Sequence, residues 1–285
     1  MTTEPHSFKR LVLGLQPREP DHIVRLAVEL ADLLKLDLLG LFLEDTSLQN
    51  LAGIPFAREL RMLGGGWHPI DVSQMAGELT VAAQTTEKMF AETVKHLQTQ
   101  CRFEIARGPM AATIATVSQT SDIVVIGEPA SAAERVSQQF SWLFQAAWRS
   151  AATVMIVPGR IVRVRGPVVA IATAPDDPSI AVAANFAVAA NEELVVVDAC
   201  EKAIDEAQIR ALAATKKVTV KHIVGGKAIA ANATALEQTL RSLHERLVVM
   251  TRAASEGQAA SRIAAARQVP VLVVEPINAP AAAAA

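Results

Sequence analysis

The chain alternates short apolar segments with longer amphipathic ones, and this alternation occurs twice along its length. Segments such as DIVVIG and ELVVVD have the length of strands and are almost continuously apolar, as strands buried on both faces of a parallel sheet are. Between the strand-like segments, residues 21–34 carry apolar side chains three or four positions apart, which is helical spacing. Strands that alternate with helices predict an α/β fold. The repeat predicts two tandem doubly wound, Rossmann-like units.

The apolar pattern also sets the expected boundaries. The first unit spans residues 1–158 and the second spans 167–276. The linker at 159–166, with its three arginines, is expected to be solvated, and the Ala/Pro-rich tail at 277–285 to be disordered. Strands are expected at 11–15, 38–43, 102–106, 123–126, 153–157, 167–172, 194–197, 218–223, 247–250 and 271–274. Helices are expected from residue 21 and at 72–100, 110–120, 141–149, 178–190, 203–214, 228–244 and 258–266.

Composition excludes several classes of protein. The 285 residues carry a formal net charge of −2 at a pI of about 6.3, so the basic surface of a nucleic-acid-binding protein is not expected. No apolar segment approaches the roughly 18 residues of a membrane helix, and the first residues lack the apolar core of an export signal. Cys101 and Cys200 lie far apart in the sequence, which does not support a disulfide framework, and each is expected to be a small buried side chain. The six histidines show no metal-ligand spacing. We expect a cytoplasmic protein without membrane insertion, nucleic-acid partner or metal.

The segment 122–157 has the layout of a phosphate-binding loop that has lost glycines. An apolar strand ends at Gly127, and the following positions read Gly127-x2-Ala130-x9-Phe140-Ser141 before a short helix and a second strand. This frame resembles the universal stress protein family, whose ATP-binding members have G-x2-G-x9-G-[ST] between the same two strands. The first glycine and the final hydroxyl remain, whereas Ala130 and Phe140 stand where the family has glycine.

The resemblance extends over nearly the whole chain as a tandem pair. It implies, in each half, a five-stranded parallel sheet of order 3-2-1-4-5 of the adenine-nucleotide alpha-hydrolase type. Ligands of the family lie outside the carboxyl ends of strands 1 and 4. Nucleotide-binding members carry an aspartate just after strand 1, and the matching positions here are Gln16 and Thr173. Asp176 follows shortly after and is a substitute for that aspartate, unless Asp176 and Asp177 only start a turn or cap a helix.

Both phosphate loops depart from the pattern that the family uses. A phosphate cradle needs backbone N–H groups aimed at the anion, often with the positive φ that glycine adopts freely, and Phe140 places a ring there. Arg135 is the only cation of the first loop. In the second half Gly257 matches the last motif glycine, but the loop before it is too short, and Gly225 with Gly226 fits a strand-to-helix turn. We therefore expect no bound cofactor.

An insertion at residues 46–71 has no counterpart in the second half. It is rich in large apolar side chains and contains three consecutive glycines at 64–66. Three alternatives remain: it folds over the vacant nucleotide cleft, forms an exposed surface for a partner, or acts as a lid on a small ligand. The residues that would form such a surface or lid are Ile54, Phe56, Arg58, Trp67 and His68.

The sequence shows no recognisable nucleophile elbow or acid–base pair with a partner. The first hypothesis is a non-catalytic tandem universal stress protein that acts through contacts with an unidentified protein partner in stress or metabolic regulation. The alternative is a sensor that binds ATP or AMP through Gly127, Arg135 and Ser141 or through Asp176, Gly225 and Gly257. A third hypothesis is a structural subunit of a larger complex. A homo-oligomer also stays open, and strands 153–157 and 271–274 are expected to pair with each other.

Overall fold

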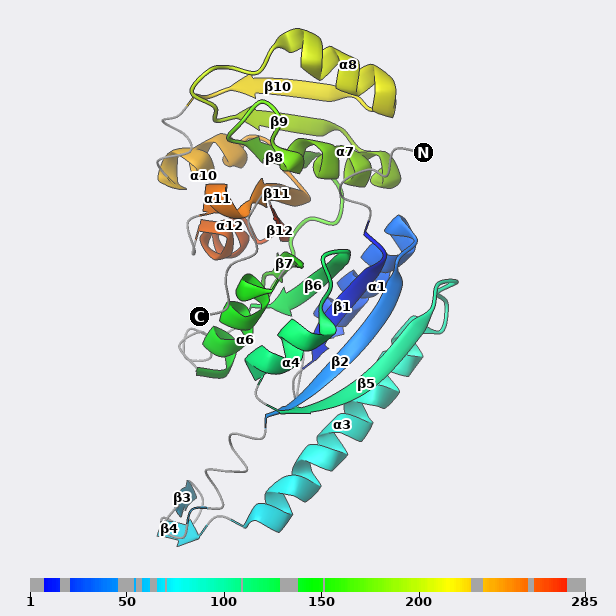
Figure 1. Ribbon diagram of the computed structural model, residues 1–285, viewed down its shortest axis with the longest axis vertical. Coiled ribbons are helices and arrows are strands. Elements are labelled where there is room, and N and C mark those ends of the chain that lie inside the picture. The colour runs from blue at the N-terminus through cyan, green and yellow to red at the C-terminus, as the bar shows by residue number, and fades with distance from the viewer. Residues whose placement is uncertain are drawn as a thin grey trace.

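The computed structural model describes residues 8–15, 21–45, 54, 58–61, 66–69, 71–108, 110–128, 138–150, 152–226, 233–255 and 259–275. Ten strands form one continuous sheet, of order β10-β9-β8-β11-β12-β7-β6-β1-β2-β5 (Figure 1). The first half contributes β1 (Arg10–Leu15), β2 (Asp37–Asp45), β5 (Cys101–Gly108), β6 (Asp122–Gly127) and β7 (Thr153–Val157). The second contributes β8 (Val168–Ala172), β9 (Leu194–Asp198), β10 (Val220–Val224), β11 (Leu247–Thr251) and β12 (Val271–Val274).

Each half therefore has the strand order 3-2-1-4-5 that we expected. Within the ten-stranded sheet, all strand pairs inside one half are parallel. The two expected five-stranded sheets are joined into one because β12 pairs antiparallel with β7, with Leu272 opposite Met155. The expected pairing of the two terminal strands is confirmed. It removes two exposed strand edges, whose unpaired N–H and C=O groups would otherwise face water.

Helices cover both faces of the sheet, and a hydrophobic cluster lies under each layer. One face carries α1 (Asp21–Leu34), α3 (Val72–Val94), α7 (Pro178–Ala190) and α8 (Glu206–Lys216). The other carries α4 (Met110–Val117), α6 (Gln138–Arg149), α10 (Ala233–Arg241) and α12 (Ala259–Arg267). A short helix, α11 (Arg252–Ser255), follows β11. Strand residues such as Leu13 and Val12 alternate between the two clusters, because successive side chains point to opposite faces.

Several expected boundaries shift where the chain supplies a cap or a turn. The helix expected at 203–214 begins at Glu206, because the Asp205 side chain accepts a hydrogen bond from the Ala207 N–H as its N-cap. The helix expected to reach residue 100 ends at Val94, and the residues after it turn toward β5. The helix expected at 228–244 covers only 233–241 among the described residues.

We had expected the linker between the halves to be solvated, but part of it is buried. Arg163 is about three-quarters buried, and its guanidinium donates to the carbonyl oxygens of Glu245 and Arg267, each at 2.9 Å. Its Nη2 lies 3.7 Å from a carboxylate oxygen of the fully buried Glu245. The linker therefore packs on the second half, because a buried acid there needs cations around it.

The insertion contains a small antiparallel hairpin, β3 (Arg58–Arg61) and β4 (Gly66–Pro69). Figure 1 places this hairpin near the N-terminal end of α3, well away from the carboxyl ends of β1 and β6. The expectation that the insertion covers the nucleotide cleft is therefore not met by its described residues. Trp67 is 64% exposed and Ile54 is 39% exposed, while Phe56 lies outside the described residues.

The first half of α3 projects together with the hairpin. Among the side chains of α3 that the structure describes, the first buried one is Ala83, and Val81 is 62% exposed, whereas Phe90 farther along packs against the backbone of Gly40. Arg58 and His68 of the hairpin are exposed. We call the hairpin β3–β4 and residues 73–81 of α3 the arm; most of the described side chains in this part of α3 are exposed, and Ala76 and Leu79 are partly buried. An exposed apolar surface on such an arm is typical of a contact site.

Candidate functional site

In the first half, the structure describes only part of the expected nucleotide site. Gly127 is the last residue of β6 and pairs with Val157. Phe140 and Ser141 lie in the first turn of α6, which begins three residues earlier than expected. Gln16, Ala130 and Arg135 lie outside the described residues. The structure therefore places the ends of this loop but leaves its centre undescribed.

In the second half, Thr173 stands at the position that corresponds to the family's aspartate, and it is already bound by a neighbouring side chain. The backbone N–H and the hydroxyl of Thr173 both donate to Asp177 Oδ2, at 2.9 and 3.0 Å. The other oxygen of Asp177 accepts from the Ser179 N–H at 2.9 Å and so caps α7. The expectation that this acidic pair caps a helix is confirmed for Asp177. The donors of Thr173 are therefore already used within the protein.

Asp198, which was not among the predicted site residues, is a second acid at the carboxyl ends of these strands that is held by several hydrogen bonds. It ends β9, and its side chain is fully buried. One carboxylate oxygen accepts from the Cys200 N–H at 3.0 Å, and the other accepts from the Ile204 N–H at 2.7 Å and lies 3.3 Å from His222 Nε2. Its carbonyl oxygen accepts from the N–H groups of both Gly225 and Gly226. The two glycines thus close the ends of β9 and β10 instead of cradling an anion.

These contacts fix the ionisation of the cluster. Burial raises the pKa of the Asp198 carboxyl, but the hydrogen bonds from Ile204, Cys200 and His222 bring it below its usual value. Burial, and then the adjacent Asp198 carboxylate, raise the pKa of the Cys200 thiol to about 12. A thiol that stays protonated at neutral pH is a poor nucleophile. The cluster therefore holds loops together and is not arranged for cysteine chemistry.

The lowered pKa of Asp198 predicts a specific loss of stability in acid. Because the folded-state pKa lies below the unfolded value of about 3.9, the contribution is fully present above about pH 5 and is lost as pH falls through the folded-state pKa. Asp198→Asn should lower the free energy of unfolding at pH 7 and flatten its decline in acid. Urea unfolding at a series of pH values measures both effects. Asp176→Asn, which changes an exposed carboxylate, is the control. Parallel pH profiles for wild type and Asp198→Asn would refute this role.

Arg252 follows β11, where the second phosphate loop should begin. Its side chain instead joins the two halves. The Arg252 guanidinium donates to the carbonyl oxygens of Trp148, Ser150 and Ala152, the last two at 2.9 and 2.7 Å. It lies 5.5 Å from the centroid of the Trp148 ring, and its Nε lies 2.6 Å from a Glu275 oxygen. Burial lowers the pKa of Arg252, which the Glu275 carboxylate opposes. A cation at the carboxyl end of α6 is favourable.

The remaining candidate site residues of the second half are not brought together by the described structure. Asp176 is exposed and lines a largely apolar hollow of ≈ 310 Å³ between α7 and α8, together with Pro178, Ile180 and Gln208. Gly225 and Asp198 are not part of that lining, and Gly257 lies outside the described residues. The structure therefore does not bring Asp176, Gly225 and Gly257 together as a described site.

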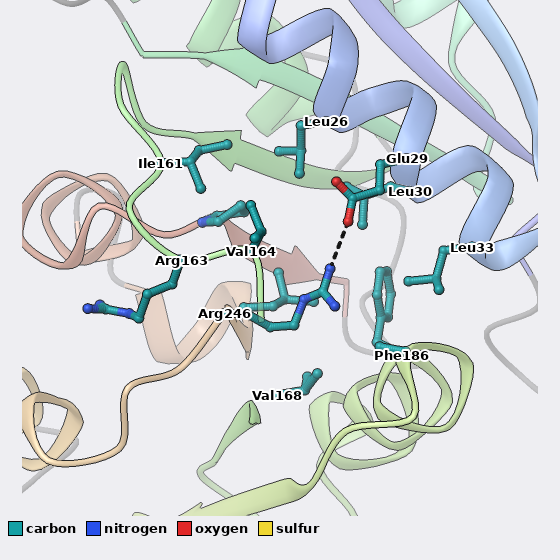
Figure 2. Close-up of a pocket in the computed structure, with 13 residues that line it drawn as sticks. Leu26, Glu29, Leu30, Leu33, Ile161, Arg163, Val164, Val168, Phe186 and Arg246 are labelled. Atoms are coloured by element: carbon teal, nitrogen blue, oxygen red, sulfur yellow. Dashed lines mark hydrogen bonds and ion pairs between the residues drawn. The ribbon is translucent and has the colours of Figure 1, made fainter. Parts of the chain in front are cut away.

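A second hollow lies at the junction of the halves, between α1, the linker and α7 (Figure 2). Leu26, Ile161 and Phe186 form part of its apolar wall, and Arg246 crosses it to reach Glu29, with 3.2 Å between Nη2 and Oε1. The space open to a water-sized sphere is ≈ 20 Å³, about one water molecule. The hollow is therefore a seam between the halves and not a ligand pocket.

Across the described ranges, no group of three or more His, Cys, Asp or Glu side chains is placed to hold a metal ion. Both cysteines are free thiols; Cys200 is buried as expected, and Cys101 is partly buried. No described helix is both long and apolar enough to span a membrane.

Comparison with known proteins rests on structure, because no protein-family model and no curated protein matches the sequence. A universal stress protein from Archaeoglobus fulgidus superposes with a TM-score of 0.62 at 14% identity, over 95% of this chain and 98% of that one. The chain has the fold of a universal stress protein. Two proteins from Pseudomonas aeruginosa, one of unknown function and one a putative universal stress protein, match at 13% and 14% identity with TM-scores of 0.49 and 0.48. Each match covers 96% of this chain and 95% of the other.

Within the universal stress protein fold, Asp198 and Arg252 lie at the carboxyl ends of β9 and β11, and neither was among the predicted site residues. Asp198 carried a signal that was available, since it is a charged residue at the carboxyl end of an almost wholly apolar strand. Arg252 carried a weaker one, as the first charged residue after β11. Their partners come from strands and helices far away in the sequence, so the contacts themselves could not be inferred.

Proposed function

We propose that this chain is a non-catalytic tandem protein of the universal stress protein type that has lost nucleotide binding and acts in stress or metabolic regulation through protein contacts. The stress-related part of the proposal is supported by the fold shared with the Archaeoglobus fulgidus protein. The loss of nucleotide binding and the use of protein contacts are supported by the chain's own residues.

A single observation carries the loss of binding. In the second half, the polar groups at the carboxyl ends of the strands already bind one another: Thr173 binds Asp177, and Asp198 binds Cys200, Ile204 and His222. A ribose or phosphate would have to break these buried hydrogen bonds, and each broken bond leaves a buried polar group unsatisfied at a cost of about 1–3 kcal/mol.

The absence of catalysis is supported by the state of the Cys200 thiol. Cys200 lies beside an aspartate and a histidine, which superficially resembles a catalytic set. However, it is 3% exposed, its thiol pKa is raised to about 12, and His222 is bonded to Asp198. Activation of a thiol requires a lowered pKa or an adjacent free base.

The protein-contact part of the proposal is supported by the arm. Trp67 and Val81 expose most of their surface, and the two strands of the hairpin pair with each other. An exposed aromatic side chain such as Trp67 is typical of the centre of a protein–protein interface. The partner that this surface suits is a protein with an apolar groove.

The proposal predicts that adenine nucleotides do not stabilise the protein. With millimolar ATP, ADP, AMP or a cyclic nucleotide, the melting temperature should equal that in buffer with the same amount of inorganic triphosphate. The purified protein should show no excess absorbance at 260 nm. A ligand at about 100 times its dissociation constant would add about 2.7 kcal/mol, which is a shift of several degrees. Such a shift would favour the sensor hypothesis, and Thr173→Val against Ser141→Ala would then identify the half that binds.

A further inference from the structure

β5 is the last strand at the first-half end of the sheet. Among the described residues it pairs only with β2, over the whole range from Cys101 to Gly108. A strand of this length with a free edge presents a row of unpaired N–H and C=O groups. A further strand that pairs with this edge would satisfy these backbone groups.

The backbone just before β5 shows which residues face outward. The Gln100 carbonyl oxygen accepts from the Leu38 N–H at 2.8 Å, and the Gln100 N–H donates to the side-chain Oδ1 of Asp37 at 3.3 Å. Both groups of Gln100 therefore face β2. Because the direction alternates along a strand, Arg102 and Glu104 also direct their backbone groups to β2. Cys101, Phe103 and Ile105 direct theirs to the open edge.

The side chains add a second pattern. Arg102 and Glu104 are both exposed, lie on the same face of the strand and form no ion pair within the described chain. They are placed symmetrically on either side of Phe103. A strand with opposite charges at equal distances from one residue is complementary to an inverted copy of itself.

We propose that two copies of this chain associate through β5, antiparallel, about a two-fold axis at Phe103. Phe103 then faces Phe103 of the second copy, and Cys101 faces Ile105. All three have outward backbone groups, so each pair exchanges two N–H···O bonds, as antiparallel pairing requires. The two ten-stranded sheets become one continuous sheet.

In this register Arg102 stands directly opposite Glu104 of the second copy, and the reverse pair forms on the other side of the axis. These are the non-hydrogen-bonded positions, where opposing Cα atoms approach to about 4.5 Å and side chains interact most strongly. A hollow of ≈ 180 Å³ on the same face, lined by Arg10, Asp37, Arg102 and Glu104, leaves room for the second pair of side chains. Ile105, which is 44% exposed, covers the partly buried Cys101 of the second copy.

Other pairings lack this complementarity. Moving the axis to Ile105 or to Cys101 keeps the backbone groups aligned but sets Arg102 opposite Gly108 or Gln100. The edge at the other end of the sheet is β10, where an axis at His222 would set Lys221 opposite Ile223, with no charge pair. Charge complementarity therefore favours pairing through β5, in the register with the two-fold axis at Phe103.

Sedimentation equilibrium over a concentration series tests the proposal. Wild type should be a dimer that dissociates on dilution. Arg102→Glu places two glutamates opposite each other at both sites and should raise the dissociation constant at least about tenfold. The double variant Arg102→Glu/Glu104→Arg recreates both pairs with the charges exchanged and should restore dimerisation. Lys221→Glu on β10, with the same change of charge, should behave as wild type.

Thermal unfolding of each variant first establishes that it is folded. A wild type that stays monomeric at every concentration would overturn the proposal. So would a dimer that is indifferent to Arg102→Glu, since it would use another surface. A folded double variant that remains as weak as Arg102→Glu would overturn the register. None of these outcomes bears on nucleotide binding, so this test and that of the proposed function fail independently.

Discussion

Replacing Gly166 by alanine should destabilise the protein by about 2–5 kcal/mol. Gly166 precedes β8 with φ of +125°, a conformation that side chains rarely adopt, and a Cβ atom there would lie 2.4 Å from the carbonyl oxygen of His244. That oxygen belongs to backbone, so it cannot rotate away. The neighbouring Pro167 carbonyl accepts from the Arg246 N–H at 3.0 Å, and a shift of the backbone would strain this bond between β8 and β11.

The midpoint of urea unfolding measures the effect, and the chain offers a matched control. Gly77 lies in α3 with no heavy atom within 4 Å of an added Cβ. Gly77→Ala should therefore be neutral or stabilise the helix by up to about 1 kcal/mol. If Gly166→Ala unfolds at the same urea concentration as Gly77→Ala, the close approach to His244 does not constrain the fold.

Replacing Arg267 by methionine should cost about 3–5 kcal/mol. Glu245 is 0% exposed, and Arg267 binds both its carboxylate oxygens, at 2.8 and 3.2 Å, while Arg163 lies farther away at 3.7 Å. Without Arg267 the buried carboxylate keeps only the more distant cation. The energetic penalty is that of a buried charge left without its main partner.

A double variant separates this penalty from general damage to the core. Arg267→Met/Glu245→Leu removes the charge together with its partner, and a buried ion pair replaced by apolar groups is often close to neutral. The double variant should therefore be more stable than Arg267→Met alone. At the surface, Arg210→Met removes an ion pair with Glu206 in which both side chains are about 70% exposed or more, and the expected change is under about 1 kcal/mol. Additive losses in the double variant would contradict the buried-charge explanation.

Much of the fold could be predicted from the sequence because burial leaves a local signature. The strand at 153–157, the helix at 178–190 and the strand at 271–274 have the expected boundaries, since apolar runs and a proline at a helix start act over a few residues. The hairpin β3–β4 was not predicted, because its segment lacks a clear alternation of apolar and polar residues.

The candidate site was harder, because its polar groups are satisfied by distant residues. Thr173 and Asp177 are close in sequence, and the capping role of Asp177 could be anticipated. Asp198 and His222 come from different strands, and Arg252 reaches carbonyl groups about a hundred residues away. Which of several charged residues becomes buried depends on how the halves pack, and hydrophobic patterning carries no information about that choice.

The order of strands and helices, the tandem repeat and the strand ends at which a ligand site would lie could all be predicted from the amino-acid sequence. These properties follow from the spacing of apolar residues and from the topology that parallel strands impose. The three-dimensional structure was needed to show that Arg163 packs against Glu245 and Arg267, and that Arg252 joins the halves. The reason is physical: a buried charge or strand edge must find a partner wherever the fold brings one, and distance along the chain does not limit that choice.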